Sequence, residues 1–162
     1  MLKISNKRIL FLIIRLVIII VFLYVLLFHV IGVYINDSTN MNPSVKPGDL
    51  VITYRLNKQY EKGDIILINN SFVRIVGSCK DEITINENNQ LLINGQMIEE
   101  EIYFDTFIDS ESNIKYPYIV EKGEYFVLND YRLDNNDSRS FGSINTKDVK
   151  GLVIASIRIK GF

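Results

Sequence analysis

The sequence predicts a mostly β fold, in which one β domain follows a single N-terminal transmembrane helix. Three observations support this fold class. A long apolar run occupies residues 9–35, and the rest of the chain contains short runs of β-branched and aromatic residues bounded by Gly, Asn and Asp. No segment between those runs keeps the 3.6-residue apolar period of a helix. A chain of 162 residues, 48% of them hydrophobic, is long enough for one such domain.

The apolar run, ILFLIIRLVIIIVFLYVLLFHVIGVYI, is interrupted only by Arg15 and His29. It exceeds the roughly 20 residues that a helix needs to cross the hydrocarbon core of a membrane. A cleavable signal peptide would have an apolar stretch of about 7–15 residues followed by a small-residue cleavage site. We therefore expect an uncleaved membrane anchor over residues 9–35, with the Arg15 guanidinium reaching the interface along its aliphatic stem.

The residues before the anchor predict its orientation. Lys3, Lys7 and Arg8 precede the apolar run with no acidic residue among them, so the positive-inside rule places residues 1–8 in the cytoplasm. Residues 36–162 then lie outside, as the extracytoplasmic domain of a single-pass protein of the cell membrane. In that part 19 acidic residues face 14 basic ones, because four of the 18 Lys and Arg residues lie before it. This balance gives no electrostatic reason to expect a nucleic acid partner.

The cysteine and histidine content excludes two kinds of site. Cys79 is the only cysteine, so no intramolecular disulfide can form, and the only histidine, His29, lies in the apolar run. A Cys/His zinc site and a Ser-His-Asp triad outside the membrane are therefore both excluded. We expect no metal and no cofactor.

The β domain is expected to contain a main sheet and a smaller lobe. Residues 78–118 are more polar and acidic than their surroundings, and we expect them to form a small β lobe inserted in the main sheet, with a hairpin turn at Glu87–Asn89. The expected strands correspond to the runs DLVITYRL, GDIILI, FVRIVG, EITIN, QLLING, EYFVLND and GLVIASIRI.

A polar stretch after the anchor, STNMNPSVKPGDL over residues 38–50, begins a series of motifs. It is followed in order by KGDIILI, FVRIVG and, near the end, NDYRLDNNDSRSFG. Together these motifs resemble the type I signal peptidases, the membrane-anchored serine proteases that remove signal peptides from exported proteins. The resemblance covers nearly the whole chain and implies a signal-peptidase-like β domain. The last motif matches the family signature Gly-Asp-Asn-Arg…Asp-Ser-Arg…Phe-Gly at Asp130, Arg132, Asp137, Ser138, Arg139, Phe141 and Gly142.

The family's chemistry needs a serine hydroxyl that attacks the scissile carbonyl and a lysine, kept neutral by apolar surroundings, that removes its proton. The Met-x-Pro frame places the nucleophile position at Asn40, and the Arg-Ile-Val-Gly run places the base position at Val73. The serine that orients the lysine corresponds to Asn135. Since neither a carboxamide nor a valine can perform these steps, the resemblance implies a catalytically degenerate member.

Other family positions keep their expected residues. Ser38 corresponds to the oxyanion-hole position, although a serine in a polar turn is equally explained as a turn residue. The family also implies a supporting charge cluster of Arg74, Asp137 and Arg139. The residues expected to bind an extended peptide are Ser38, Asn40, Met41, Phe72 and Val73.

The sequence leaves three functions open. In the first, the protein is a peptide-binding chaperone or assembly factor for exported surface proteins such as pilins, because degenerate family members are associated with pilus assembly in Gram-positive bacteria. In the second, it is an active type I signal peptidase that uses a displaced pair, Ser44 and Lys46. In the third, it is a structural anchor for another protein, which would need an exposed apolar patch instead of an open groove.

Overall fold

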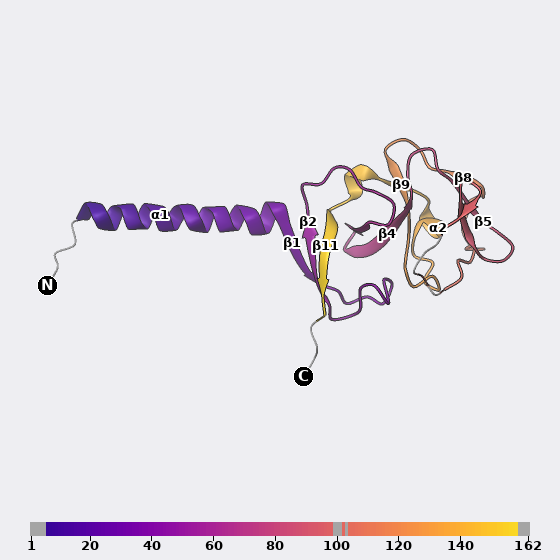
Figure 1. Ribbon diagram of the computed structural model, residues 1–162, viewed down its shortest axis with the longest axis horizontal. Coiled ribbons are helices and arrows are strands. Elements are labelled where there is room, and N and C mark those ends of the chain that lie inside the picture. The colour runs from indigo at the N-terminus through magenta and orange to yellow at the C-terminus, as the bar shows by residue number, and fades with distance from the viewer. Residues whose placement is uncertain (1–5, 99–101, 103, 159–162) are drawn as a thin grey trace.

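The computed structural model describes residues 6–98, 102 and 104–158. A long N-terminal helix projects from a β domain, as Figure 1 shows. The domain contains a seven-stranded and a four-stranded sheet, and all of the strand pairs in the described residues are antiparallel. The predicted mostly β fold with one N-terminal apolar helix is therefore confirmed.

The N-terminal helix consists of α1, Asn6–Val25, and a π-helical turn, Leu26–Val30. Residues Lys7–Val30 have a mean hydropathy of 3.2, and none of this stretch is buried against the rest of the protein. With a rise of about 1.5 Å per residue, 24 residues extend about 36 Å, which is enough to cross the hydrocarbon core. By length and composition, this helix is a candidate membrane span.

The helix is shorter than the predicted anchor of residues 9–35. It ends at Val30, and the last five residues of the apolar run form β1, Ile31–Ile35. This stretch has a β-branched residue at every second position, and its backbone pairs with β2, Leu50–Tyr54. Such alternation favours a strand when a partner strand is available, and this preference ends the helix although the apolar character continues.

The junction between helix and strand is held by Arg55, the residue after β2. Its backbone N–H donates to the Val30 carbonyl at 2.9 Å, and its guanidinium donates to the Phe28 carbonyl and, at 3.0 Å, to the Tyr34 hydroxyl. The last carbonyls of a helix lack hydrogen-bond donors and form the negative end of the helix dipole. A guanidinium at this end supplies both the donors and a compensating positive charge. The N-terminal helix and the β domain are therefore connected by a side chain as well as by the backbone.

The seven-stranded sheet has the strand order β1-β2-β11-β3-β4-β9-β10. Besides β1 and β2, it contains β3 (Ile65–Ile68), β4 (Ser71–Gly77), β9 (Glu124–Leu128), β10 (Ile144–Asn145) and β11 (Gly151–Ile157). Two short helices, α2 (Ser138–Phe141) and the 3-10 helix Thr146–Asp148, lie between β9 and β11. β3 and β4 are joined by Asn69 and Asn70, whose positive φ angles of 43° and 66° are typical of a two-residue type I′ turn.

The four-stranded sheet lies at the end of the domain away from α1 (Figure 1) and has the order β7-β6-β5-β8. It is built from β5 (Glu82–Ile85), β6 (Leu91–Ile93), β7 (Gln96–Met97) and β8 (Tyr118–Ile119). Because β5 and β6 pair as neighbours in an antiparallel hairpin, the hairpin predicted at Glu87–Asn89 is confirmed.

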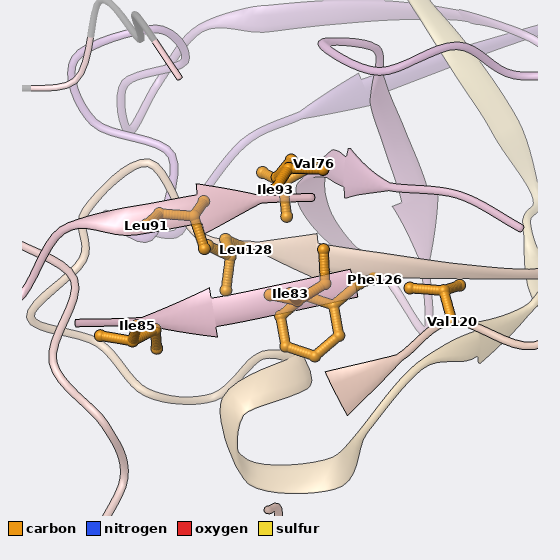
Figure 2. Packing of buried hydrophobic residues seen from close by; sticks show 8 residues of the cluster. All are labelled: Val76, Ile83, Ile85, Leu91, Ile93, Val120, Phe126 and Leu128. Carbon is orange, nitrogen blue, oxygen red and sulfur yellow. The ribbon is translucent and has the colours of Figure 1, made fainter. Parts of the chain in front are cut away.

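A buried apolar cluster joins the two sheets, as Figure 2 shows. The large sheet contributes residues of β4 and β9, and the small sheet contributes residues of β5 and β6. The members are Val76, Ile83, Ile85, Leu91, Ile93, Val120, Phe126 and Leu128. Burial of these side chains stabilises the small sheet against the large one.

Candidate functional site

The predicted nucleophile position lies in the loop between β1 and β2, residues 36–49. Asn36 closes the base of this loop, because its N–H donates to the Asp49 carbonyl at 2.9 Å and its carbonyl accepts from the Gly48 N–H at 2.7 Å. The Asp49 carboxylate accepts from the Lys46 N–H at 2.9 Å, and this hydrogen bond is the main reason why the pKa of Asp49 is lowered. The loop is therefore held in one conformation by its own polar groups.

Asn40 lies at the centre of this loop, and only 4% of its surface is exposed. Its side-chain nitrogen, Nδ2, faces three oxygen atoms: the Phe72 carbonyl at 2.6 Å, Asn129 Oδ1 at 3.0 Å and Ser71 Oγ at 3.1 Å. Its backbone carbonyl accepts from the Tyr131 N–H at 2.8 Å. Position 40 is therefore tied both to β4 and to the segment after β9.

Asn129 fixes the orientation of the Asn40 amide. The Asn129 Nδ2 donates to the carbonyls of Asp134 at 3.2 Å and Asn136 at 3.4 Å, so its Oδ1 is the atom that faces Asn40. Because the Phe72 carbonyl is also only an acceptor, Asn40 must present its NH₂ group to both. Its own Oδ1 is then buried without a hydrogen-bond partner among the described residues. An amide nitrogen held in this way supplies no nucleophile for acyl transfer.

Val73, at the predicted base position, packs in the core with 1% of its surface exposed. Side chains alternate along a strand, so Val73 shares its face of β4 with Ser71, which contacts Asn40. Positions 40 and 73 thus belong to one region, but the Val73 side chain is buried and lines neither of the two pockets described below. The other buried members of its cluster are Tyr60, Ile66, Ile68, Ile75 and Val127. These apolar surroundings would disfavour a charged amine, yet valine has no group that can accept a proton.

Ser38 and Asn135 have separate roles. The Ser38 hydroxyl accepts from the Asn40 N–H at 3.2 Å, which closes the turn that both residues share. Asn135 lies in the turn before α2, where its backbone carbonyl accepts from the Asp137 N–H at 2.7 Å and from the Ser140 hydroxyl. Ser38 is therefore next to position 40, whereas Asn135 contributes to the geometry of a turn.

Asp137 and Arg139 form a completely buried ion pair. The Arg139 guanidinium donates to both carboxylate oxygens, at 2.9 and 2.7 Å, and to the carbonyls of Arg132 at 2.8 Å and Asp134 at 2.7 Å. The same carboxylate caps α2 by accepting the Arg139 N–H, and it also accepts the Asn129 N–H at 3.0 Å. This ion pair therefore organises the segment that positions Asn129.

Arg74 forms a second ion pair, with the buried carboxylate of Asp130. Its Nε and Nη2 atoms donate to the two carboxylate oxygens at 2.8 and 2.6 Å. The guanidinium also donates to the Gly63 carbonyl at 2.8 Å and to Ser44 Oγ at 3.0 Å. The charge cluster expected from the sequence is thus built from two ion pairs, and Asp130 is the member that was not assigned to it.

Two pockets adjoin the loop. One is lined by loop residues that precede Asn40 in the sequence, and the other by loop residues that follow it. The first, of about 190 Å³, lies between β1 and the β3–β4 hairpin, and Tyr34, Asn36, Asn70 and Phe72 are among its lining residues. The second, of about 1100 Å³, lies between the large sheet and the β6–β7 hairpin. Its lining includes Ser44, Lys62, Arg74, Ile93 and Met97.

Ser44 and Lys46, the displaced pair considered above, are both exposed. The Ser44 hydroxyl accepts a hydrogen bond from Arg74, whose guanidinium stays protonated and cannot act as a base. Lys46 uses its backbone N–H to donate to Asp49. The neighbour that the structure gives to the Ser44 hydroxyl is therefore unsuited to activating it.

Comparison with known proteins agrees with this architecture. The family model described as signal peptidase, peptidase S26, matches residues 9–157. Signal peptidase I U of Bacillus subtilis (strain 168) is 30% identical over 129 residues, covering 71% of this chain and 68% of the relative. Signal peptidase I of Bacillus licheniformis is 28% identical over 134 residues, covering 73% and 72%. Signal peptidase IB of Staphylococcus aureus (strain COL) is 26% identical over an alignment of 172 positions, covering 91% and 88%.

Among solved structures, a signal peptidase I from Enterococcus faecalis V583 aligns with a TM-score of 0.46 and 22% identity, covering 60% of this chain and 97% of that chain. The fold and the site define a β domain that follows an apolar helix, with a polar centre held between a loop and a central strand. The chain belongs to the signal peptidase family, peptidase S26. The resemblance predicted from its motifs is therefore confirmed.

Asn129 is the site residue that sequence reasoning missed. It holds the Asn40 amide in place, and no role was predicted for it. A signal was nevertheless present, because the family signature has Gly where this chain has Asn129. This departure from the family signature at position 129 could have identified the residue.

Proposed function

We propose that this protein is a membrane-anchored member of the signal peptidase family that lacks the catalytic serine and lysine. In this proposal it binds extended segments of exported proteins, as a chaperone or assembly factor with pilins as its partners. The observation that carries the proposal is the Asn40 amide, buried among three acceptors at the nucleophile position, together with a buried valine at the base position. These groups supply neither a nucleophile nor a general base.

The smaller pocket supports binding of an extended peptide. β1 lies at the edge of the large sheet, and β9 pairs with β4 only from Arg74 onwards. Tyr34 of β1 and Phe72 of β4 line the same pocket. Strand edges bind extended segments through backbone hydrogen bonds, and the pocket between them accommodates side chains. This binding requires no catalytic group.

The helix Lys7–Val30 supports a location in the cell membrane, with residues 1–8 in the cytoplasm and the β domain outside. Protease added to intact, wall-stripped cells should digest the β domain. Protection of the domain in such cells, together with its digestion in inside-out vesicles, would reverse the orientation.

Binding can be tested by photo-crosslinking in cells. Ile35 lines the smaller pocket, whereas Val33, on the same side of β1, does not, and both side chains are exposed. A crosslinking residue at position 35 should capture segments of exported proteins, and the same residue at position 33 is the matched control. We expect crosslinks mapped to pilin segments from position 35, together with defective assembly of surface polymers when the gene is removed. Equal crosslinking from both positions would contradict a groove at this site.

The alternative is an active signal peptidase that uses Ser44 and Lys46. Its test is incubation of the purified full-length protein with a preprotein in detergent. We expect no cleavage, because the Ser44 hydroxyl is paired with a guanidinium. Turnover that disappears in Ser44→Ala and Lys46→Ala variants would establish the displaced pair and overturn the proposal.

A further inference from the structure

The backbone carbonyl of Phe72 faces the side of β4 on which β9 pairs only from Arg74 onwards. Phe72 is paired with Leu67 in the β3–β4 ladder, and the Leu67 carbonyl accepts from the Lys150 N–H at 2.8 Å, on the β11 side. The two residues therefore form a pair without mutual hydrogen bonds, and the backbone groups of Phe72 point away from β3. On that side, the pairing of β4 with β9 begins only at Arg74. This carbonyl is thus an acceptor that an added peptide strand would use.

In this structure Asn40 takes that acceptor. Its Nδ2 lies 2.6 Å from the Phe72 carbonyl, the shortest of its three contacts. The amide is held there by Asn129, whose own NH₂ group is bonded to two carbonyls and cannot rotate without losing them. The arrangement leaves Asn40 Oδ1 buried with no partner in the described part of the chain, which is unfavourable for an amide that is free to choose its orientation. The Phe72 carbonyl and Asn129 Oδ1 therefore impose the position of the Asn40 amide.

We propose that Asn40, oriented by Asn129, blocks the β4 edge of the peptide groove. This inference rests on the proposed peptide-binding function and specifies how the groove selects its ligand. A bound segment pairs with β1, fills the smaller pocket beside Phe72 and cannot form a hydrogen bond to the Phe72 carbonyl. The segment therefore pairs with β1 alone and does not pair with β4 between Phe72 and Arg74. The ligand class is a short extended segment with apolar side chains, bound along one edge only.

The block predicts that removal of the Asn40 amide increases affinity. The probe is a fluorescent peptide of alternating alanine and valine, titrated against the full-length protein in lipid nanodiscs. Asn40→Ala frees the Phe72 carbonyl for one neutral hydrogen bond, so binding should become roughly fivefold tighter. Ser71→Ala is the matched control, because it removes another contact of the same amide and leaves the block in place. Its affinity should equal that of the wild type.

A second set of peptides identifies the hydrogen bond. Each peptide has one backbone N–H replaced by an N-methyl group, and the gain in the Asn40→Ala protein should vanish for one position only. If the alanine variant does not fold, Asn40→Ser replaces it as a variant with a shorter side chain.

Each outcome has a distinct meaning. Equal or weaker binding by a folded variant at position 40, with the wild type still binding the probe, would overturn the block and leave peptide binding intact. Absence of binding by the wild type and all variants would instead refute the proposed function, and the block with it.

Discussion

Two polar networks lie side by side at the site, and they differ in completeness. In the charged network, Arg139 and Asp137 satisfy each other and several backbone groups while completely buried. In the amide network, Asn40 Nδ2 lies within hydrogen-bonding distance of three oxygens, but its own Oδ1 has no partner among the residues that the structure describes. The first network stabilises the segment on which the site is built, whereas the second surrounds the predicted nucleophile position. The two networks therefore serve different ends, because folding depends on the charged network, whereas the amide network lies at the family's nucleophile position.

The largest expected effect is the loss of the buried ion pair. Arg139→Met should lower the free energy of unfolding by about 3–5 kcal/mol, because it leaves the Asp137 carboxylate buried without its cation. Denaturant unfolding of the full-length protein in detergent measures the loss. Arg158→Met is the control, since Arg158 is half exposed at 3.4 Å from its partner Asp49. A loss of similar size at both positions would mean that the charged network has no special role.

The second expected effect comes from Val73→Lys, which tests whether the core still suits a neutral lysine. The apolar cluster should lower the pKa of the new amine, at a cost of about 3 kcal/mol at neutral pH. Because the unfolded chain then binds the additional proton, the variant should lose stability as the pH falls below about 10. Unfolding curves at pH 7 and pH 10 measure this, with Val73→Met as an uncharged control. A variant that is equally stable at both values would show that the lysine reaches water.

The third effect concerns the amide network itself. Asn40→Ala should lower the free energy of unfolding by about 1–2 kcal/mol, because it leaves acceptors at Phe72 and Asn129 without their donor. Asn40→Asp should lower it further at neutral pH, since a carboxylate would face the same two acceptors. Burial beside these oxygens should raise the pKa of the new carboxyl, so part of the loss should be recovered as the pH falls. If Asn40→Asp is as stable as the wild type at pH 7, the assigned amide orientation is wrong.

Sequence reasoning predicted most of the fold because its signals were local. The apolar run, the short β-branched runs and the polar hairpin turn each depend on neighbouring residues. β1 was missed because Ile31–Ile35 continues the apolar run, and only its pairing with β2 distinguishes it from the helix. The partnership of Arg74 with Asp130 was also missed, because the two residues are 56 positions apart and their contact depends on the pairing of β4 with β9. Burial of Val73, too, was not evident from the sequence, since residues on both faces of β4 are apolar.

The smallest expected effect is the acid sensitivity of the loop that carries Asn40. The pKa of Asp49 is lowered from its ordinary value of 3.8, chiefly by the hydrogen bond from the Lys46 N–H, with Arg158 as a further cause. A lowered pKa means that the unfolded chain binds the proton more readily, so the carboxylate stabilises the fold fully above pH 3.8. This contribution should decrease as the pH falls below that value, and it should be absent below the pKa of the folded state.

The difference in unfolding free energy between the wild type and Asp49→Asn, followed from pH 6 down to pH 2, should therefore diminish. Replacing Arg158 should have a smaller effect. In Arg158→Ala, unfolding free energy should still depend on pH in this range, because the Lys46 N–H still donates to the Asp49 carboxylate. A difference that stays constant across the range would show that Asp49 holds the loop through its shape and not through its charge.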